Sequence, residues 1–291
     1  MARPKAVVLN GLGIGCHEET AHAYEKAGAE AEVVHIGRLF SGELDLSEVQ
    51  ILNPAGGFLQ GDKLGSGMCA ASELEYAVSQ TDESVKERLL KFAEKGVIYG
   101  QCNGFQFLVK TGLLPGIDGD YSKQVVTLTH NECGNYRVSP VFHKVVSDHF
   151  AFEGVDSDNF WLWCRHAEGN LKFHSEHGSI SKEDAEATRD IVNRDYVTLR
   201  YADPVTGEPN EEFPHNPNGS IDAIAGLANQ TGNIFANMAH PEVSVYASRD
   251  PRWFDWKDDL RRNGMKAEQL DKFLNEGAGA RIFENIVGYF R

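Results

Sequence analysis

The chain has few basic residues for its length. Its 291 residues include 28 lysines and arginines against 43 aspartates and glutamates, which gives a formal net charge of −15. Such an acidic surface repels phosphates, so the balance argues against a nucleic-acid binder and against docking on anionic lipid. We therefore expect no nucleic-acid partner and no membrane partner.

Long apolar runs are also missing. No stretch approaches the roughly 20 apolar residues that a membrane-spanning helix needs, and Asn10 and Gly11 interrupt the short apolar run near the N-terminus before it could act as the core of a secretory signal. Repeats, low-complexity tracts and a convincing interdomain linker are absent as well. The sequence predicts a single domain over residues 1–291.

Cysteine pairs are the third absence. The five cysteines are widely scattered and include no C-x-x-C pair: Cys16, Cys69, Cys102, Cys133 and Cys164. This pattern favours a reduced, cytoplasmic protein over a disulfide scaffold or a structural zinc site. Free cysteines are usually buried and inert, and we expect this of all but Cys102.

The first hundred residues alternate short apolar strands with helices. Strands are predicted over residues 5–10, 31–36, 49–54 and 96–100, with a helix over 18–27 and another that begins at the capping box Ser84-x-x-Glu87. Apolar strands separated by helices indicate a parallel sheet with both faces covered. The expected fold class is α/β, a three-layer, flavodoxin-like arrangement with a mostly parallel central sheet.

The rest of the chain has a different pattern. Strands of antiparallel character are predicted over residues 124–130, 135–142, 160–166 and 196–203, a surface helix or loop over 179–193, a core strand over 233–240 and a helix over 280–289. These add a smaller antiparallel element to the sheet. Residues 246–279 are predicted to be an insertion or an elaboration before the C-terminal helix.

Cys102 is the strongest candidate for a reactive residue. It lies in Gly100-Gln101-Cys102-Asn103-Gly104, between a predicted strand and a predicted helix, where flanking glycines allow a sharp and strained turn. The positive end of the following helix favours a thiolate. The N–H of Asn103 could help to bind an oxyanion.

A nucleophile needs a base, and His240-Pro241-Glu242 follows the last predicted core strand. In an extended segment the i, i+2 spacing puts both side chains on one side, so Glu242 could orient His240. We expect Pro241 to prevent a helix there. Alone the motif suggests a solvated loop histidine, but with Cys102 it makes a Cys-His-Glu triad.

Paired glycines end the third predicted strand, in Pro54-Ala55-Gly56-Gly57-Phe58. Glycines at a strand's carboxyl end let a substrate approach the backbone. A tight turn is the simpler interpretation when the motif is taken by itself. Next to Cys102 it becomes the second half of an oxyanion hole.

Two other clusters are weaker. The run Gly11-Leu12-Gly13-Ile14-Gly15 lacks the G-x-G-x-x-G spacing of a dinucleotide site. A second set could be drawn as a metal site but matches no common ligand spacing: His166, Glu168, His174, Glu176 and His177. We expect a hydrated polar surface there and no metal.

Taken together, the motifs resemble those of class I (triad-type) glutamine amidotransferases, and more narrowly the glutaminase subunits of phosphoribosylformylglycinamidine synthase. The similar segments occur in order: PAGGFLQGDKL (54–64), GQCNGFQFLVKTGLLPG (100–116), THNECGNYRV (129–138), RHAEGNL (165–171) and the run ending in NMAHPE at 242. The departures are Gly65, where that family usually has arginine, and Ala167, where it usually has glycine.

The resemblance implies specific roles. Cys102 would be the nucleophile, His240 the base and Glu242 its orienting carboxylate. Oxyanion-hole N–H groups would come from Gly57, Phe58 and Asn103, and Gln106 would help to hold glutamine.

The resemblance also implies partners. Ammonia would pass to a synthetase subunit, with a small accessory subunit as a further partner, and ATP and Mg²⁺ would act on the synthetase, so this chain would need no cofactor. Two rivals remain: a stand-alone Cys-His-Glu hydrolase of γ-glutamyl or peptide bonds, and a non-catalytic regulatory module of the same fold.

Overall fold

The computed structural model describes residues 2–76, 83–158, 160–173, 182–264, 266 and 276–291. Within these ranges nine strands form one sheet in the order β2-β1-β3-β4-β11-β10-β9-β6-β7, and β5 and β8 form a separate antiparallel pair. The strands are β1 Lys5–Asn10, β2 Glu30–His35, β3 Ile51–Pro54, β4 Val97–Gln101, β5 Val126–Thr129, β6 Arg137–Val145, β7 Trp161–His166, β8 Asn170–Phe173, β9 Val197–Tyr201, β10 Ile224–Ala228 and β11 Ile234–Asn237. The α-helices are α1 His17–Lys26, α2 Ile36–Phe40, α3 Met68–Tyr76, α4 Val85–Ala93, α5 Asn103–Lys110, α6 Lys182–Asp195, α7 Trp253–Arg262 and α9 Ala280–Gly288.

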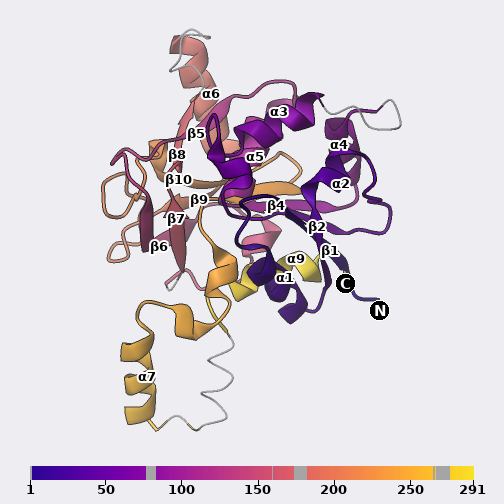
Figure 1. Cartoon of the computed structure of the whole chain (residues 1–291). Coiled ribbons are helices and arrows are strands. Elements are labelled where there is room, and N and C mark those ends of the chain that lie inside the picture. The colour runs from indigo at the N-terminus through magenta and orange to yellow at the C-terminus, as the bar shows by residue number, and fades with distance from the viewer. Residues whose placement is uncertain (1, 77–82, 159, 174–181, 265, 267–275) are drawn as a thin grey trace.

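Helices cover both faces of the parallel half of the sheet, which runs from β2 to β11. Successive side chains of a strand point to opposite faces, so Val7 and Leu9 of β1 pack in one core and Ala6 and Val8 in the other. Helices α3, α4 and α5 contribute to the first core, and α1 and α9 to the second (Figure 1). The predicted three-layer α/β fold is confirmed.

The other half of the sheet is antiparallel, as the sequence predicts for the middle of the chain. Strands β10, β9, β6 and β7 continue from β11 with antiparallel pairing. Two strands, β8 and β10, were not predicted from the sequence. Every residue of β10 (IAGLA) is buried, so the strand lacks the alternation of apolar and polar residues that marks a half-exposed strand.

The strand expected over residues 31–36 is present as β2, but it is an edge strand and not a buried one. Val34 is buried while Val33 is 41% exposed. Ile36 starts α2, because the side chain of His35 accepts a hydrogen bond from the N–H of Gly37 at 3.1 Å and caps the helix. The capping box at the start of α4 is confirmed, since Ser84 and Glu87 each accept the other's backbone N–H, at 3.1 and 2.9 Å.

The segment 246–279 carries α7 away from the sheet (Figure 1), and no residue of α7 is buried. Its two ends lie together, because Gly277 and Gly279 donate backbone hydrogen bonds to Val245 and Ser244 at 3.2 and 2.8 Å. That this segment is an insertion into one domain over 1–291 stays a prediction. Among the helices in the described ranges, none has the length and apolar character to cross a membrane.

Candidate active site

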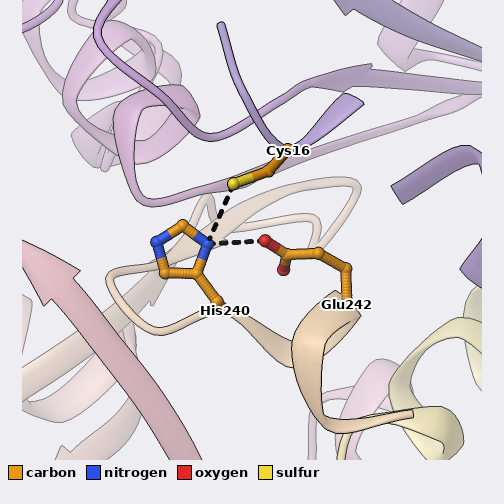
Figure 2. Close-up of side chains that lie close together, drawn as sticks. All are labelled: Cys16, His240 and Glu242. Carbon is orange, nitrogen blue, oxygen red and sulfur yellow. Dashed lines mark hydrogen bonds and ion pairs between the residues drawn. The ribbon is translucent and has the colours of Figure 1, made fainter. Parts of the chain in front are cut away.

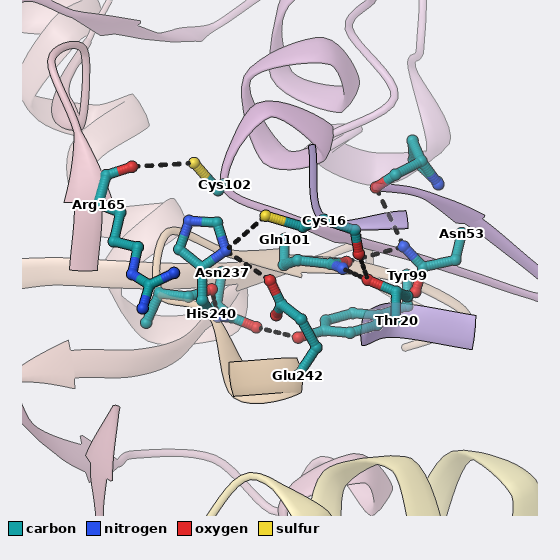
Figure 3. Close-up of polar contacts among 12 residues, drawn as sticks. Cys16, Thr20, Asn53, Tyr99, Gln101, Cys102, Arg165, Asn237, His240 and Glu242 are labelled. Carbon is teal, nitrogen blue, oxygen red and sulfur yellow. Dashed lines mark hydrogen bonds and ion pairs between the residues drawn. The ribbon is translucent and has the colours of Figure 1, made fainter. Parts of the chain in front are cut away.

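The loops that follow four neighbouring parallel strands meet at one edge of the sheet. Cys102 directly follows β4 and His240 follows β11, and the register pairs Gln101 with Asn237 at the ends of these strands. Residues 55–58 follow β3, and Cys16 comes after β1. Ligands of open α/β sheets bind at the carboxyl ends of the strands. Figure 3 shows that Cys102, Cys16 and Glu242 all lie around His240 at this edge.

Cys102 occupies the strained corner that the sequence predicts. Its φ of 51° and ψ of −107° lie in a region that residues with a side chain rarely adopt. The flanking glycines make the corner possible: an added Cβ would lie 2.0 Å from the carbonyl oxygen of Pro54 at Gly104, and 2.8 Å from the backbone of Gly104 at Gly100. Asn103 is then the first residue of α5, where the N–H has no partner within the helix.

His240 and Glu242 form a buried ion pair. The distance from Nδ1 to Oε1 is 2.5 Å, and each residue is 2% exposed. Burial lowers the pKa of His240, but the carboxylate of Glu242 and the neighbouring sulfur of Cys102 outweigh it, so that this pKa is raised well above its ordinary value. With its Nδ1 proton directed at Glu242, the ring presents Nε2 to a reaction partner.

The backbone around this pair differs from the expected extended segment. His240 has φ −109° and ψ 82°, and residues Pro241–Ser244 form a 3₁₀ turn with Pro241 in its first position. Proline suits that position, because its missing N–H would have no helical partner there and its φ is preset. The contact between the two side chains is present, but our reason for it was wrong: a tight turn, and not an extended segment, brings the Glu242 carboxylate to Nδ1 of the ring.

The nucleophile and the base adjoin without the hydrogen bond of an attacking pair. The Cys102 thiol donates to the carbonyl of Arg165 at 3.6 Å (Figure 3), and His240 Nε2 is buried with no partner among the described residues. An added Cβ at Gly56 would lie 2.8 Å from His240 Cε1 and 3.4 Å from Cys102 Cβ, so the two side chains flank this glycine. Such pairs often tighten only when substrate binds.

The predicted oxyanion-hole loop packs tightly against the glycine run 11–15. The N–H of Phe58 donates to the carbonyl of Gly13 at 2.8 Å. Gly57 has φ 150°, and an added Cβ would lie 2.6 Å from Ile14 Cα. At Gly13 an added Cβ would lie 2.0 Å from the carbonyl oxygen of Phe58. The glycine run therefore serves close packing, and the oxyanion roles of Gly57, Phe58 and Asn103 stay predictions.

Both polar atoms of the Gln106 side chain form hydrogen bonds within the protein. It is 3% exposed; its Nε2 donates to the carbonyl of Glu168 at 2.7 Å, and its Oε1 accepts from Asn103 Nδ2 at 2.9 Å. Asn103 Oδ1 in turn accepts the N–H of Leu59 at 3.2 Å, which ties α5 to the loop after β3. The predicted role of Gln106 in holding glutamine stays a prediction.

Cys16 is the residue that the sequence analysis missed. Its Sγ lies 3.7 Å from His240 Nδ1, on the same nitrogen that contacts Glu242 (Figure 2). Burial raises the pKa of this thiol. Its position after the first strand indicates only that its loop reaches the carboxyl edge of the sheet. No local motif pairs it with His240.

The other cysteines and the histidine cluster have different surroundings. Burial raises the pKa of Cys164 to about 12, in keeping with an inert thiol, whereas Cys133 is exposed, against expectation. The expectation of a hydrated polar surface at the histidine cluster is wrong for its described members, because His166 and Glu168 are buried. Burial lowers the pKa of His166 to about 3, and its Nε2 lies 3.0 Å from Asn218 Nδ2. The other members at 174, 176 and 177 lie outside the described residues.

Comparison with known proteins identifies relatives over the whole chain. The model of the CobB/CobQ-like glutamine amidotransferase domain matches residues 3–290. Phosphoribosylformylglycinamidine synthase subunit PurQ of Dehalococcoides mccartyi is 35% identical, over 100% of this chain and 99% of that protein. The subunit of the same name from Methanococcus maripaludis is 32% identical, over 99% and 97%.

Solved structures share the fold. The structure described as PurLQS from Thermotoga maritima aligns with a TM-score of 0.64 and 24% identity over 100% of both chains. A glutamine amidotransferase from the same organism aligns with a TM-score of 0.50 and 17% identity over 99% of both chains. At these identities the likeness supports the α/β architecture alone.

Proposed function

Because the chain belongs to the CobB/CobQ-like glutamine amidotransferase family, we propose that it hydrolyses glutamine to glutamate and ammonia as a subunit of phosphoribosylformylglycinamidine synthase. The observation that carries the proposal is the convergence of Cys102, His240 and Glu242 at the carboxyl edge of the sheet. The acceptor is inferred from the relatives, which are named as subunits of that synthase. It is formylglycinamide ribonucleotide, which the synthetase converts to formylglycinamidine ribonucleotide.

The site supports a two-stage acyl transfer. The Cys102 thiolate attacks the side-chain carbonyl carbon of glutamine, and protonated His240 gives its Nε2 proton to the departing ammonia. This leaves a glutamyl thioester on Cys102. Water, deprotonated by Nε2 of His240, then attacks the thioester, glutamate leaves, and the Cys102 thiolate and protonated His240 are restored.

The surroundings stabilise the charges of both stages. Glu242 holds the positive ring of His240 through the 2.5 Å contact at Nδ1, as the third member of such triads does. The N–H groups of Asn103, Gly57 and Phe58 bind the oxyanion, once the N–H of Phe58 has left the carbonyl of Gly13.

The reaction on this chain consumes only glutamine and water. We therefore assign ATP and Mg²⁺ to the synthetase subunit, and no cofactor to this chain. The relatives are named as subunits of phosphoribosylformylglycinamidine synthase, which supports a complex of this chain with a synthetase subunit. A small accessory subunit is the further partner that we propose. We assign this chain to the cytoplasm, which its proposed role in purine synthesis and its five free cysteines support.

The test is nitrogen transfer by the complex. With the cognate synthetase, ATP, Mg²⁺ and formylglycinamide ribonucleotide, we expect glutamine to support product formation only when this chain is present, while ammonium salts support it without the chain. Product formed from glutamine in the absence of the chain would contradict the proposal. Strong hydrolysis of peptides or γ-glutamyl bonds without a partner would favour the stand-alone hydrolase. Absence of glutamine hydrolysis both with and without the synthetase would favour the non-catalytic module.

A further inference from the structure

The contact between Cys16 and the triad has no part in the proposed reaction. Cys16 Sγ, a ring nitrogen of His240 and a carboxylate oxygen of Glu242 all lie within 4.8 Å of one another, and the described residues contain no other such group of three or more His, Cys, Asp or Glu side chains. We propose that these three side chains form an inhibitory binding site for a thiophilic divalent cation, of which Zn²⁺ is the best fit.

The donor set has the chemistry of zinc. Thiolate, imidazole and carboxylate are the three ligand types that Zn²⁺ takes in proteins, and a site with three protein ligands keeps one position open for water. Zn–S and Zn–N bonds of about 2.3 and 2.0–2.1 Å at a tetrahedral angle put sulfur and nitrogen about 3.6 Å apart. The observed distance from Cys16 Sγ to His240 Nδ1 is 3.7 Å.

Glu242 has to move for the cation to enter. Its Oε1 lies 2.5 Å from His240 Nδ1, whereas two oxygen and nitrogen ligands of one zinc ion lie about 3.4 Å apart. The other oxygen, Oε2, is buried with no hydrogen-bond partner among the described residues. The carboxylate can therefore move about 1 Å away from His240 Nδ1, because no hydrogen bond at Oε2 has to break. When the cation binds, Oε2 can gain it as a partner.

The backbone holds the sulfur in place. The N–H of Cys16 donates to the carbonyl of Gly56 at 3.1 Å, and its carbonyl accepts from the hydroxyl of Thr20 at 2.6 Å. That hydroxyl accepts from Gln101 Nε2 at 2.6 Å, so the start of α1 is tied to the end of β4 beside the nucleophile (Figure 3). A ligand held on both sides loses little conformational freedom on metal binding.

Metal at Nδ1 would stop the catalytic cycle. The thiol of Cys16 and the Nδ1 of His240 each release a proton to solvent, the contact between Glu242 Oε1 and Nδ1 breaks, and three bonds form to the cation, Zn–S, Zn–N and Zn–O. The remaining ring proton then stays on Nε2, so His240 cannot accept a proton from water in the second stage. Binding of metal depends only on the geometry, while its effect on rate rests on the proposed function.

Binding is tested with Co²⁺ as a spectroscopic probe, because a cobalt–thiolate bond gives a charge-transfer band that oxygen and nitrogen ligands do not. We expect the band in the chain with Cys102→Ser, and its loss when Cys16→Ser is added. A band that survives Cys16→Ser but disappears with Cys102→Ser would overturn the proposal and place the metal on the nucleophile. Zn²⁺ should displace Co²⁺ and abolish the band.

Inhibition is tested in the complex with the synthetase, as the rate of glutamine hydrolysis at buffered free Zn²⁺. Each variant is compared with its own metal-free rate. Cys16→Ser should raise the inhibitory Zn²⁺ concentration about tenfold or more, because a hydroxyl is a poor substitute for a soft thiolate ligand. The matched control is Cys133→Ser, which removes an exposed thiol and should leave inhibition unchanged. Equal inhibition of wild type and Cys16→Ser would overturn the proposal even if glutaminase activity is present.

Discussion

The N–H of Phe58 donates a 2.8 Å hydrogen bond to the carbonyl of Gly13. This joins the loop after β3 to the loop after β1, and it occupies one of the three N–H groups assigned to the oxyanion hole. For Phe58 to serve in the proposed oxyanion hole, its N–H must leave the carbonyl of Gly13, which requires the two loops to separate.

The first prediction concerns this hydrogen bond. We expect slow amide hydrogen exchange at Phe58 in the isolated chain, faster exchange in the complex with the synthetase, and a parallel rise in glutamine hydrolysis, since the released N–H can then bind the oxyanion. Removal of one such donor typically costs about 10²–10³ in rate. Equal rates of hydrolysis with and without the partner would contradict this.

The second prediction concerns the narrow space between nucleophile and base. Gly56→Ala puts a methyl group 2.8 Å from His240 Cε1 and 3.4 Å from Cys102 Cβ. We expect glutamine hydrolysis by the complex to fall about a hundredfold, since a shift of about 1 Å in reacting groups can cost that much. Overpacking should lower the free energy of unfolding by about 1–3 kcal/mol.

The matched control is Gly15→Ala in the facing loop, where an added Cβ meets nothing within 4 Å. It should retain most of the activity and the stability of wild type. If Gly56→Ala were as active as Gly15→Ala, the catalytic pair would have to lie elsewhere.

The third prediction concerns the ion pair of His240 and Glu242. The charge of Glu242 contributes to the raised pKa of His240, so Glu242→Gln should lower that pKa. His240 must be protonated to release ammonia, and the loss of activity at high pH should therefore begin at a lower pH in the variant. The rate at the optimum should fall by up to about 10⁴, as for other triads that lose the orienting carboxylate. An unchanged alkaline limb in the pH–rate profile would argue against this role for Glu242.

The fourth prediction concerns buried neutral histidines outside the triad. Burial lowers the pKa of His143 and His149 to about 4. In the unfolded chain these histidines bind a proton at about pH 6.5. The contribution of the two neutral side chains to the free energy of unfolding is therefore complete above that pH and is lost as the pH falls toward 4. His143→Phe should make the acid decline in the free energy of unfolding shallower by up to about 1.4 kcal/mol per pH unit in this window.

Urea denaturation at a series of pH values measures this slope. The control is His22→Phe, at an exposed histidine that contacts the hydroxyl of Tyr246 at 2.6 Å, and it should keep the wild-type slope. Identical slopes in wild type and His143→Phe would show that His143 is protonated in the folded state.

The sequence carried enough information to find Cys102 but not Cys16. Cys102 can be recognised from its neighbours in the sequence. It turns at φ 51°, and glycines stand at positions 100 and 104, where an added Cβ would collide with nearby backbone. Cys16 is marked only by its contact with His240, which is 224 positions away in the chain. That contact follows from the strand order β1-β3-β4-β11, and strand order depends on packing of the whole sheet, which local patterns do not encode.

The backbone conformations of the site show the same limit. The His240–Glu242 pair could be predicted from its residue types, yet the 3₁₀ turn of Pro241–Ser244 could not, since proline is compatible with an extended segment and with the first turn of a helix. Likewise, Phe58 could be assigned to an oxyanion hole, but the bond of its N–H to Gly13 arises from a loop contact between distant segments.

The proposed function requires that Cys102, and no other thiol, attacks glutamine. Its most direct test is labelling of the complex by a glutamine-mimicking electrophile, followed by mass mapping of peptides and measurement of ammonia release from glutamine. In the wild type we expect one adduct, on Cys102. In Cys102→Ala we expect no adduct and a loss of ammonia release by a factor of about 10³ or more. An adduct on Cys16, or ammonia release that persists in Cys102→Ala, would contradict it.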